Sequence, residues 1–187
     1  MATFSQAGVT DFEVYVLMTM RRRFLMAGSE GLIESKLAEV GLSLADGQRA
    51  YEQIAATLAD EACRFREMKR LLGVIDSEST HLNYGSALWP GFDFVASADG
   101  RGLLESAQYE HVGRELPGAK SPRELPPWSV DIAGFGKLFG PLEIRGKWPL
   151  FDEILPAYEE HEFRWDGDRY GVRFVWGMLL SSSMYWD

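Results

Sequence analysis

The first 73 residues carry apolar side chains at intervals of three and four, which is the spacing of one face of an α-helix. A first helix is predicted from Thr10 to just before Gly28. Thr10 and Glu13 have the spacing of a capping box, in which each side chain hydrogen-bonds the backbone N–H of the other. Apolar residues occupy most of the circumference of this helix, which is typical of a central helix in a bundle. Its main apolar face consists of Phe12, Val16, Met20 and Phe24.

Two further helices are predicted in this half. One spans about Glu30–Val40 and stops at the glycine that follows. The other begins after Ser43 and carries a single apolar stripe to Gly73, a length of about eight turns. Residues 35–54 also have the outline of a helix-turn-helix. Its turn is one residue too short, and this half has no excess of positive charge for phosphate contacts, so a plain helical hairpin is favoured.

Turn residues and strand-like alternation replace the helical spacing after Gly73. All eight prolines lie between Pro90 and Pro156. Strands bounded by such residues are expected to be short and antiparallel. The predicted pairs and segments are Phe92–Ser97 with Leu103–Val112, whose second arm has a helical alternative, then Ser129–Ile132, Leu142–Arg145, and Tyr158–Trp165 with Tyr170–Leu180 across Asp166-Gly167-Asp168.

These elements predict an α+β fold. Residues 1–73 form a helical hairpin or bundle with one long amphipathic helix, and residues 74–187 form an antiparallel sheet with long Pro/Gly-rich loops. The two parts are expected to make one compact unit. The loops within residues 113–150 are candidates for function, because long irregular connections in compact domains often carry it.

Composition narrows the class of protein. No apolar run approaches the roughly 18 residues of a membrane span, and the N-terminus lacks the pattern of a secretory signal. We therefore expect a protein without membrane contact in the cytoplasm of a bacterium or of a phage-infected host cell. Cys63 is the single cysteine, which excludes an internal disulfide and a multi-cysteine metal site. It is expected in the middle of the long helix, away from the apolar stripe.

The formal net charge of −9 is unevenly distributed. Residues 1–75 carry nine basic and ten acidic side chains, whereas residues 76–187 carry ten and eighteen. Residues 152–168 alone hold seven carboxylates and one arginine. Such a segment repels nucleic acid and attracts a basic protein, although a solvated acidic surface is also ordinary in a cytoplasmic protein. The seven carboxylates are Asp152, Glu153, Glu159, Glu160, Glu162, Asp166 and Asp168.

Strand alternation divides this segment into two faces. Glu160, Glu162 and Arg164 point to one side and form a solvent-facing ribbon, with Arg173 on the facing strand available to one of the glutamates. The other side is apolar and is expected to pack over the long N-terminal helix. It carries His161, Phe163 and Trp165 on the first strand, and Tyr170, Val172, Phe174 and Trp176 on the second.

No motif of a nucleophile elbow, a phosphate-binding loop or a dinucleotide-binding loop is present. His161 and Glu160 point to opposite faces, and neither His81 nor His111 has a partner at metal-binding spacing. The Asp-Gly-Asp segment at residues 166–168 is interpreted as a hairpin turn rather than part of a calcium loop. No cofactor or metal is expected, and a role without catalysis is favoured.

Two functional hypotheses follow. The first is a non-enzymatic inhibitor whose seven carboxylates engage a basic protein partner. Proteins that bind nucleic acid are among the candidate partners. Bacterial immunity proteins and phage inhibitors of host defence work in this way as classes. The alternative is an α+β domain, binding or enzymatic, that holds a small molecule in a pocket walled by Trp89, Trp128 and Trp148. The sequence leaves the identity of the partner or ligand and the oligomeric state open.

Overall fold

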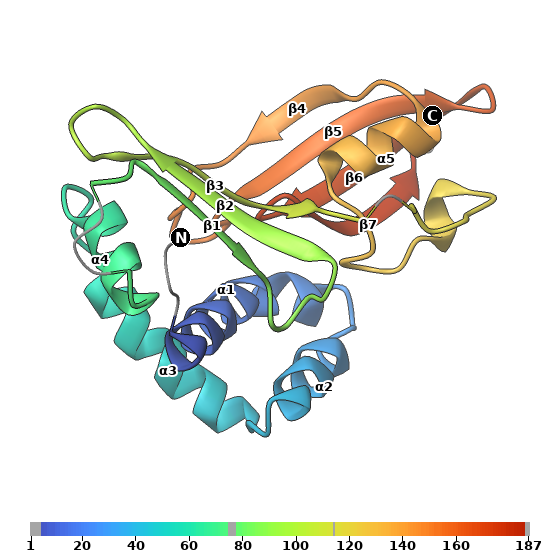
Figure 1. Cartoon of the computed structure of the whole chain (residues 1–187). Helices are drawn as coiled ribbons and strands as arrows, with labels where there is room; N and C mark the ends of the chain where they lie inside the picture. The colour runs from blue at the N-terminus through green and yellow to red at the C-terminus, as the bar shows by residue number, and fades with distance from the viewer. Residues whose placement is uncertain (1–4, 75–77, 114, 186–187) are drawn as a thin grey trace. The chain divides into compact units, whose positions relative to one another are not determined.

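The computed structural model of the chain describes residues 5–74, 78–113 and 115–185. The described elements are α+β, as predicted: helices fill the N-terminal region, and the strands form two antiparallel sheets (Figure 1). One sheet has the order β1-β2-β3 and the other the order β4-β5-β6-β7. Contacts divide the chain into two compact units. The first unit comprises Met1–Pro90 with Phe94–Ala107, and the second comprises Gly91–Asp93 with Gln108–Asp187.

Helix α1 (Gln6–Met26) begins earlier than the sequence predicted. Its N-cap is Ser5, whose hydroxyl accepts a hydrogen bond from the N–H of Gly8 at 3.4 Å. Thr10 already lies inside the helix, where its hydroxyl donates to the carbonyl of Gln6 at 3.0 Å. The predicted capping box at Thr10 is therefore wrong. The helix ends before Gly28 and is buried on most sides, as expected of a central helix.

The carboxylate predicted to complete that box is buried instead. Glu13 accepts hydrogen bonds from the backbone N–H groups of Ala87 at 3.0 Å and Leu88 at 2.7 Å. These two residues lie in the loop between β1 (His81–Gly85) and β2 (Phe92–Ala98). Burial raises the pKa of Glu13 above its ordinary value, and the hydrogen bonds from Leu88 and Ala87 oppose that rise. The side chain thus joins the central helix to the β1–β2 loop within the first unit.

The long helix predicted between Ser43 and Gly73 is two helices, and this part of the prediction is wrong. They are α3 (Leu44–Thr57) and α4 (Arg64–Leu71). Between them, the carboxylate of Asp60 accepts the N–H of Ala62 at 3.0 Å, so a side-chain hydrogen bond replaces a helical one. The apolar stripe persists across the break because residues on both sides of it remain buried.

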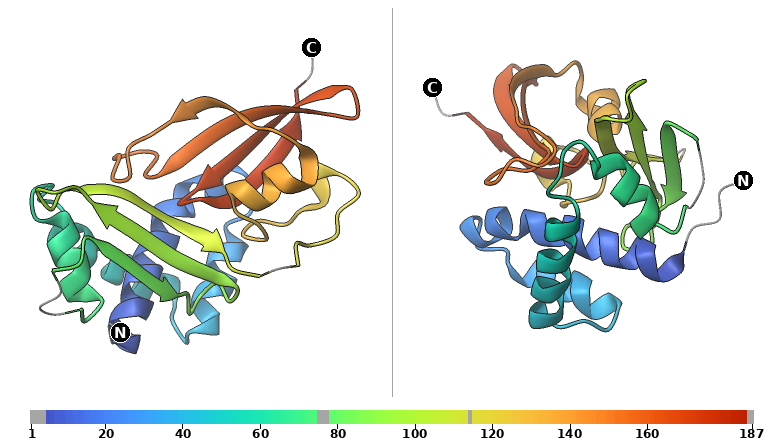
Figure 2. Two further views of the ribbon diagram at one scale, coloured as in Figure 1. Left: turned by 45° about the horizontal axis from the view of Figure 1, so that its top comes forward. Right: turned by 90° about the vertical axis from the view of Figure 1, so that its left-hand side faces the viewer.

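The remaining elements of the first unit agree with the predicted pattern. Helix α2 (Gly31–Glu39) lies within the predicted range, and α1 packs against α3 (Figure 2). The second arm of the first hairpin, β3 (Leu104–His111), is a strand and not a helix. On α1, the ring of Phe12 meets that of Phe94 on β2 edge-on, with the ring centroids 5.2 Å apart.

Consecutive strands of the second unit pair antiparallel. They are β4 (Glu143–Lys147), β5 (Tyr158–Trp165), β6 (Asp168–Val175) and β7 (Met178–Met184). Residues 166 and 167 form the predicted tight turn, with φ values of 51° and 88°.

The second arm of this hairpin was predicted as one strand, which is wrong. It is broken by another tight turn at Trp176-Gly177, where φ is 51° and 80°. Two successive residues with positive φ form the turn whose twist suits a hairpin. Tryptophan is an unusual first residue for such a turn, so only Gly177 marked it in the sequence.

The core of the second unit forms between its sheet and α5 (Ile132–Phe139), a helix that the sequence analysis did not predict. The ring of Phe135 lies 5.1 Å from that of Phe163 and 5.8 Å from that of Phe174 between centroids. The predicted apolar face of the β5–β6 hairpin is thus confirmed as core, but the helix that covers it is α5.

A strand was predicted at Ser129–Ile132, and that prediction is also wrong. The segment forms only an isolated bridge between Asp131 and Met178 before α5 begins. No helix among the described residues combines the length and the apolar character needed to cross a membrane.

We expect Glu13→Ala to lower the free energy of unfolding by about 2–4 kcal/mol, because the N–H groups of Ala87 and Leu88 lose their acceptor within the fold. The loss should be larger at pH 4.5 than at pH 7. A raised pKa means that the native state retains a proton that the unfolded chain releases, so the wild-type protein loses stability as pH rises through that window. Urea unfolding followed by circular dichroism at both pH values measures the difference.

The control for this substitution is Glu34→Ala, which removes an exposed carboxylate from α2. It should change the unfolding free energy by no more than about 0.5 kcal/mol. Equal effects of the two substitutions would contradict the role given to Glu13.

Candidate functional site

The seven carboxylates of the acidic segment do not form one patch. Asp152 and Glu153 precede β5, whereas Asp166 and Asp168 lie at the turn that follows it. An eight-residue strand separates the two pairs by roughly 25 Å. Asp152 is engaged by its own loop, since it accepts the N–H groups of residues 154 and 155 at 2.9 and 2.7 Å. A partner would therefore meet the two ends of β5 as separate acidic sites.

Glu160 and Glu162 lie on one face of the sheet, and both are paired with arginines. Arg173 approaches Glu160 with 3.3 Å between Nε and Oε1, which confirms the predicted cross-strand pair. Arg169 Nε lies 3.0 Å from one oxygen of Glu162, and Arg145 Nε lies 3.1 Å from the other. The hydrogen bonds from Arg169 and then Arg145 lower the pKa of Glu162. These two carboxylates are thus neutralised within the sheet.

Glu159 lies on the opposite face from Glu160 and Glu162, as strand alternation requires. Its carboxylate lies 2.7 Å from Nζ of Lys147 and 3.1 Å from Nε2 of His161. The hydrogen bond with His161 is the largest cause of its lowered pKa, and the contact with Lys147 adds to it. Glu159 therefore belongs to a partly buried cluster with His161 and Lys147 rather than to an acidic surface.

The three tryptophans proposed as a pocket wall are divided between the two units. Trp89 is buried in the first unit, whereas Trp128 and Trp148 belong to the second. The ring of Trp148 packs on that of Tyr158 with 5.1 Å between centroids. None of the three lines the pocket described below.

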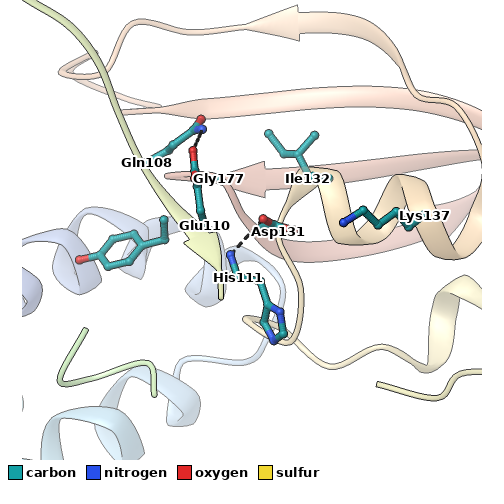
Figure 3. Close-up of a pocket in the computed structure, with 9 residues that line it drawn as sticks. Gln108, Glu110, His111, Asp131, Ile132, Lys137 and Gly177 are labelled. Atoms are coloured by element: carbon teal, nitrogen blue, oxygen red, sulfur yellow. Dashed lines mark hydrogen bonds between the residues drawn. The ribbon is translucent and has the colours of Figure 1, made fainter. Parts of the chain in front are cut away.

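A pocket of about 500 Å³ opens within the second unit, between the end of β3, the start of α5 and the β6–β7 turn (Figure 3). This volume lies in the range of small-molecule sites. The polar side chains and the turn glycine that line it are Gln108, Glu110, His111, Asp131, Lys137 and Gly177.

Asp131 holds two walls of this pocket together. One oxygen of its buried carboxylate accepts the N–H of Gly134 at 2.6 Å and caps the N-terminus of α5. The other accepts the N–H of His111, at the end of β3, at 3.0 Å. Both oxygens of Asp131 are thus occupied by backbone N–H groups. Contacts with a ligand are left to the neighbouring side chains of the pocket.

The third wall is the turn at Trp176-Gly177. The N–H of Tyr109 donates to the carbonyl of Trp176 at 2.8 Å and joins β3 to this turn. A Cβ at Gly177 would lie 2.8 Å from the carbonyl oxygen of Tyr109, and the φ of this residue is +80°. Glycine is therefore required here for both conformation and close approach.

Several polar groups in the pocket are left available for a ligand. Among the described residues, none hydrogen-bonds or ion-pairs with Nζ of Lys137, and none hydrogen-bonds with the ring nitrogens of His111. The ring of His111 is held edge-on to that of Phe92, with 5.3 Å between centroids. Gln108 donates to one oxygen of Glu110 at 2.9 Å, and no described residue hydrogen-bonds the other oxygen.

No family, curated protein or solved structure matches the chain.

Metal binding finds no support in the side-chain geometry. In the ranges that the structure describes, no three or more histidine, cysteine, aspartate or glutamate side chains are grouped so that they could hold a metal ion. The cluster of Glu159 and His161 includes Lys147, whose ammonium group would repel a cation.

Sequence reasoning missed the residues that form this pocket. His111 was considered as a metal ligand and as one of three histidines that could meet the acids in a cleft, and neither Asp131 nor Lys137 was singled out. The signal for α5 was nevertheless present: Asp131 precedes apolar residues at helical spacing, and Gly140 follows them. Two glycines inside the helix and the proline-rich surroundings obscured it.

We expect Asp131→Ala to lower the free energy of unfolding by about 2–4 kcal/mol, since it removes a helix cap and leaves the N–H of His111 without an acceptor. Chemical unfolding followed by circular dichroism measures the loss. Amide hydrogen exchange at His111 and Gly134 should accelerate in the same variant.

Asp168→Ala is the matched control, because Asp168 is exposed at a turn and caps no helix. It should leave both the unfolding free energy and the two exchange rates nearly unchanged. Retained protection of His111 in Asp131→Ala would show that this hydrogen bond does not hold the pocket together.

Proposed function

We propose that this protein binds a small polar molecule in the pocket of its second unit. The observation that carries the proposal is a concave site of about 500 Å³ into which β3 and α5 bring Glu110, His111 and Lys137 with unused hydrogen-bonding capacity. Ligand sites generally combine such a volume with a few polar groups that fix orientation. Its lining differs from the tryptophan wall expected from the sequence.

Preorganisation supports this proposal. The backbones of β3, α5 and the β6–β7 turn are joined through Asp131 and through the hydrogen bond from Tyr109 to Trp176. A site whose walls are already connected loses little conformational entropy when a ligand binds. The polar groups are thus presented on structured elements.

Binding without turnover is the simplest activity for this pocket. A general base or nucleophile is usually oriented by a third group through a hydrogen bond. Among the described residues, no carboxylate hydrogen-bonds the ring of His111, and the carboxylate of Asp131 is occupied by backbone N–H groups. The proposal therefore requires recognition alone.

We expect metabolites that bind the wild-type protein to raise its melting temperature, and Ala133→Phe to abolish that rise. Ala133 is an exposed residue of α5 that lines the pocket, so a larger side chain would fill the site without removing a polar group. A thermal-shift screen of a metabolite library with both proteins measures the effect.

Ala38→Phe, at an exposed position of α2, is the control and should respond to ligands as the wild-type protein does. The proposal fails if no compound stabilises the wild-type protein, or if every stabilising compound acts equally on Ala133→Phe.

A second proposal retains the basic protein partner, for an immunity-type or phage-inhibitor role without catalysis. Its support is the exposed carboxylates of Glu153, Asp166 and Asp168, none of which is ion-paired with a described residue. The acids within the sheet contribute less, since Glu159, Glu160 and Glu162 already have basic partners. Exposed charges of this kind act mainly by speeding the encounter with a partner of opposite charge.

Under this proposal, Asp166→Lys/Asp168→Lys should abolish capture of a basic protein from the native cell by the tagged chain. The change leaves the sheet ion pairs intact, because these residues take part in none of them. Capture followed by mass spectrometry identifies the partner, and binding to the purified partner is then measured at low and high salt.

Glu34→Lys/Glu105→Lys produces the same change in net charge at exposed positions of the first unit and is the control. Equal loss of capture in both double variants, or capture that survives in the first, would exclude a specific role for the β5–β6 turn.

A further inference from the structure

The walls of the pocket carry opposite charges. Glu110 lies on β3 and Lys137 on α5, on either side of Asp131 (Figure 3). We propose that the ligand is a zwitterion of the amino-acid or dipeptide class, with its carboxylate at Lys137 and its ammonium group at Glu110. This inference rests on the function proposed above and specifies its ligand.

Lys137 is the group that fits an anion. Its ammonium has no hydrogen bond or ion pair with a described residue, and it projects from the face of α5 that lines the pocket. The N-terminus of α5 is a poorer site for an anion, although helix N-termini often hold one. Asp131 already occupies the N–H of Gly134 there and adds its own negative charge.

The β3 wall fits a cation. Gln108 fixes one oxygen of Glu110 through a hydrogen bond of 2.9 Å, which leaves the second oxygen oriented and able to accept from an ammonium group. The nearby carboxylate of Asp131 increases the negative potential on this side. Because both of its oxygens accept backbone N–H groups, Asp131 contributes charge rather than a further contact.

A ligand with charge of a single sign suits this pocket less well. A dianion would be attracted by Lys137 but repelled by Glu110 and Asp131. A cation would be attracted by the two carboxylates but repelled by Lys137. A zwitterion can place an opposite charge at each wall. Discrimination against ions of a single sign then follows from repulsion as much as from attraction. The volume of about 500 Å³ accommodates an amino acid with its side chain.

Isothermal titration of the intact protein with the twenty free L-amino acids and their glycine dipeptides tests the inference. We expect at least one of these probes to bind, and its N-acetyl and carboxamide derivatives to bind about tenfold more weakly, since each lacks one charge-assisted contact. No binding by any of these zwitterions would overturn the inference.

Two substitutions assign each charge to its wall. Glu110→Gln should weaken the parent zwitterion about tenfold but leave the N-acetyl derivative unaffected, because that derivative has no ammonium group to lose. Lys137→Met should weaken the parent similarly and leave the carboxamide unaffected. Both residues are exposed, so the melting temperature without ligand should not change.

Glu105→Gln and Lys120→Met make the same changes of charge at exposed positions outside the pocket lining, and they should bind like the wild-type protein. Binding that is lost in Ala133→Phe but is insensitive to acetylation, amidation and both pocket substitutions would overturn the zwitterion while the proposed pocket function stands. If Ala133→Phe affects no stabilising compound of any class, the pocket function itself is wrong.

Discussion

The pocket of the second unit depends on the two backbone hydrogen bonds that the carboxylate of Asp131 accepts. This carboxylate joins the N-terminus of α5 to the last residue of β3, a backbone group twenty positions earlier in the chain. A buried carboxylate with two N–H donors is well satisfied, whereas two buried N–H groups without it are not. This side chain fixes the start of α5 against β3, and the packing of Phe135 on the sheet holds the rest of the helix that carries Lys137.

Glu13 has the corresponding role in the first unit. It lies on the central helix and holds the loop between the first two strands through two backbone N–H groups. In both units, then, a buried acid connects a helix to a segment of the sheet region. Part of the acidity of this chain is therefore structural, and net charge alone overstates how much of it is presented to a partner.

In the acidic segment, carboxylates on the solvent-facing side are likewise engaged by other groups of the protein. Four arginines of the second unit lie on β4, β5 and β6, and three of them approach Glu160 or Glu162 within 3.3 Å. Of the seven carboxylates in this segment, only Glu153, Asp166 and Asp168 are exposed and without an ion pair among the described residues. A run of like charges in a sequence becomes a patch only if the neighbouring strands do not supply the opposite charge.

Local pattern was enough for the α+β class, for α2, for the first hairpin and for the tight turn at residues 166 and 167, because each depends on spacing or turn chemistry within a few residues. It also placed Phe163 and Phe174 on the apolar face of the β5–β6 hairpin. Local pattern could not separate α3 from α4, since the apolar stripe continues across the break and the decisive hydrogen bond comes from Asp60.

Only the tertiary structure decided where the carboxylates act and what forms the pocket. Glu13 and Asp131 bond partners 74 and 20 residues away, and Glu162 meets Arg145 at a separation of 17. Such contacts depend on which segments the core brings together, which residue spacing does not encode. The sequence by itself determined the fold class, several of the elements and the amount of charge. The packing of the elements determined which charges are used within the protein and which remain for a ligand.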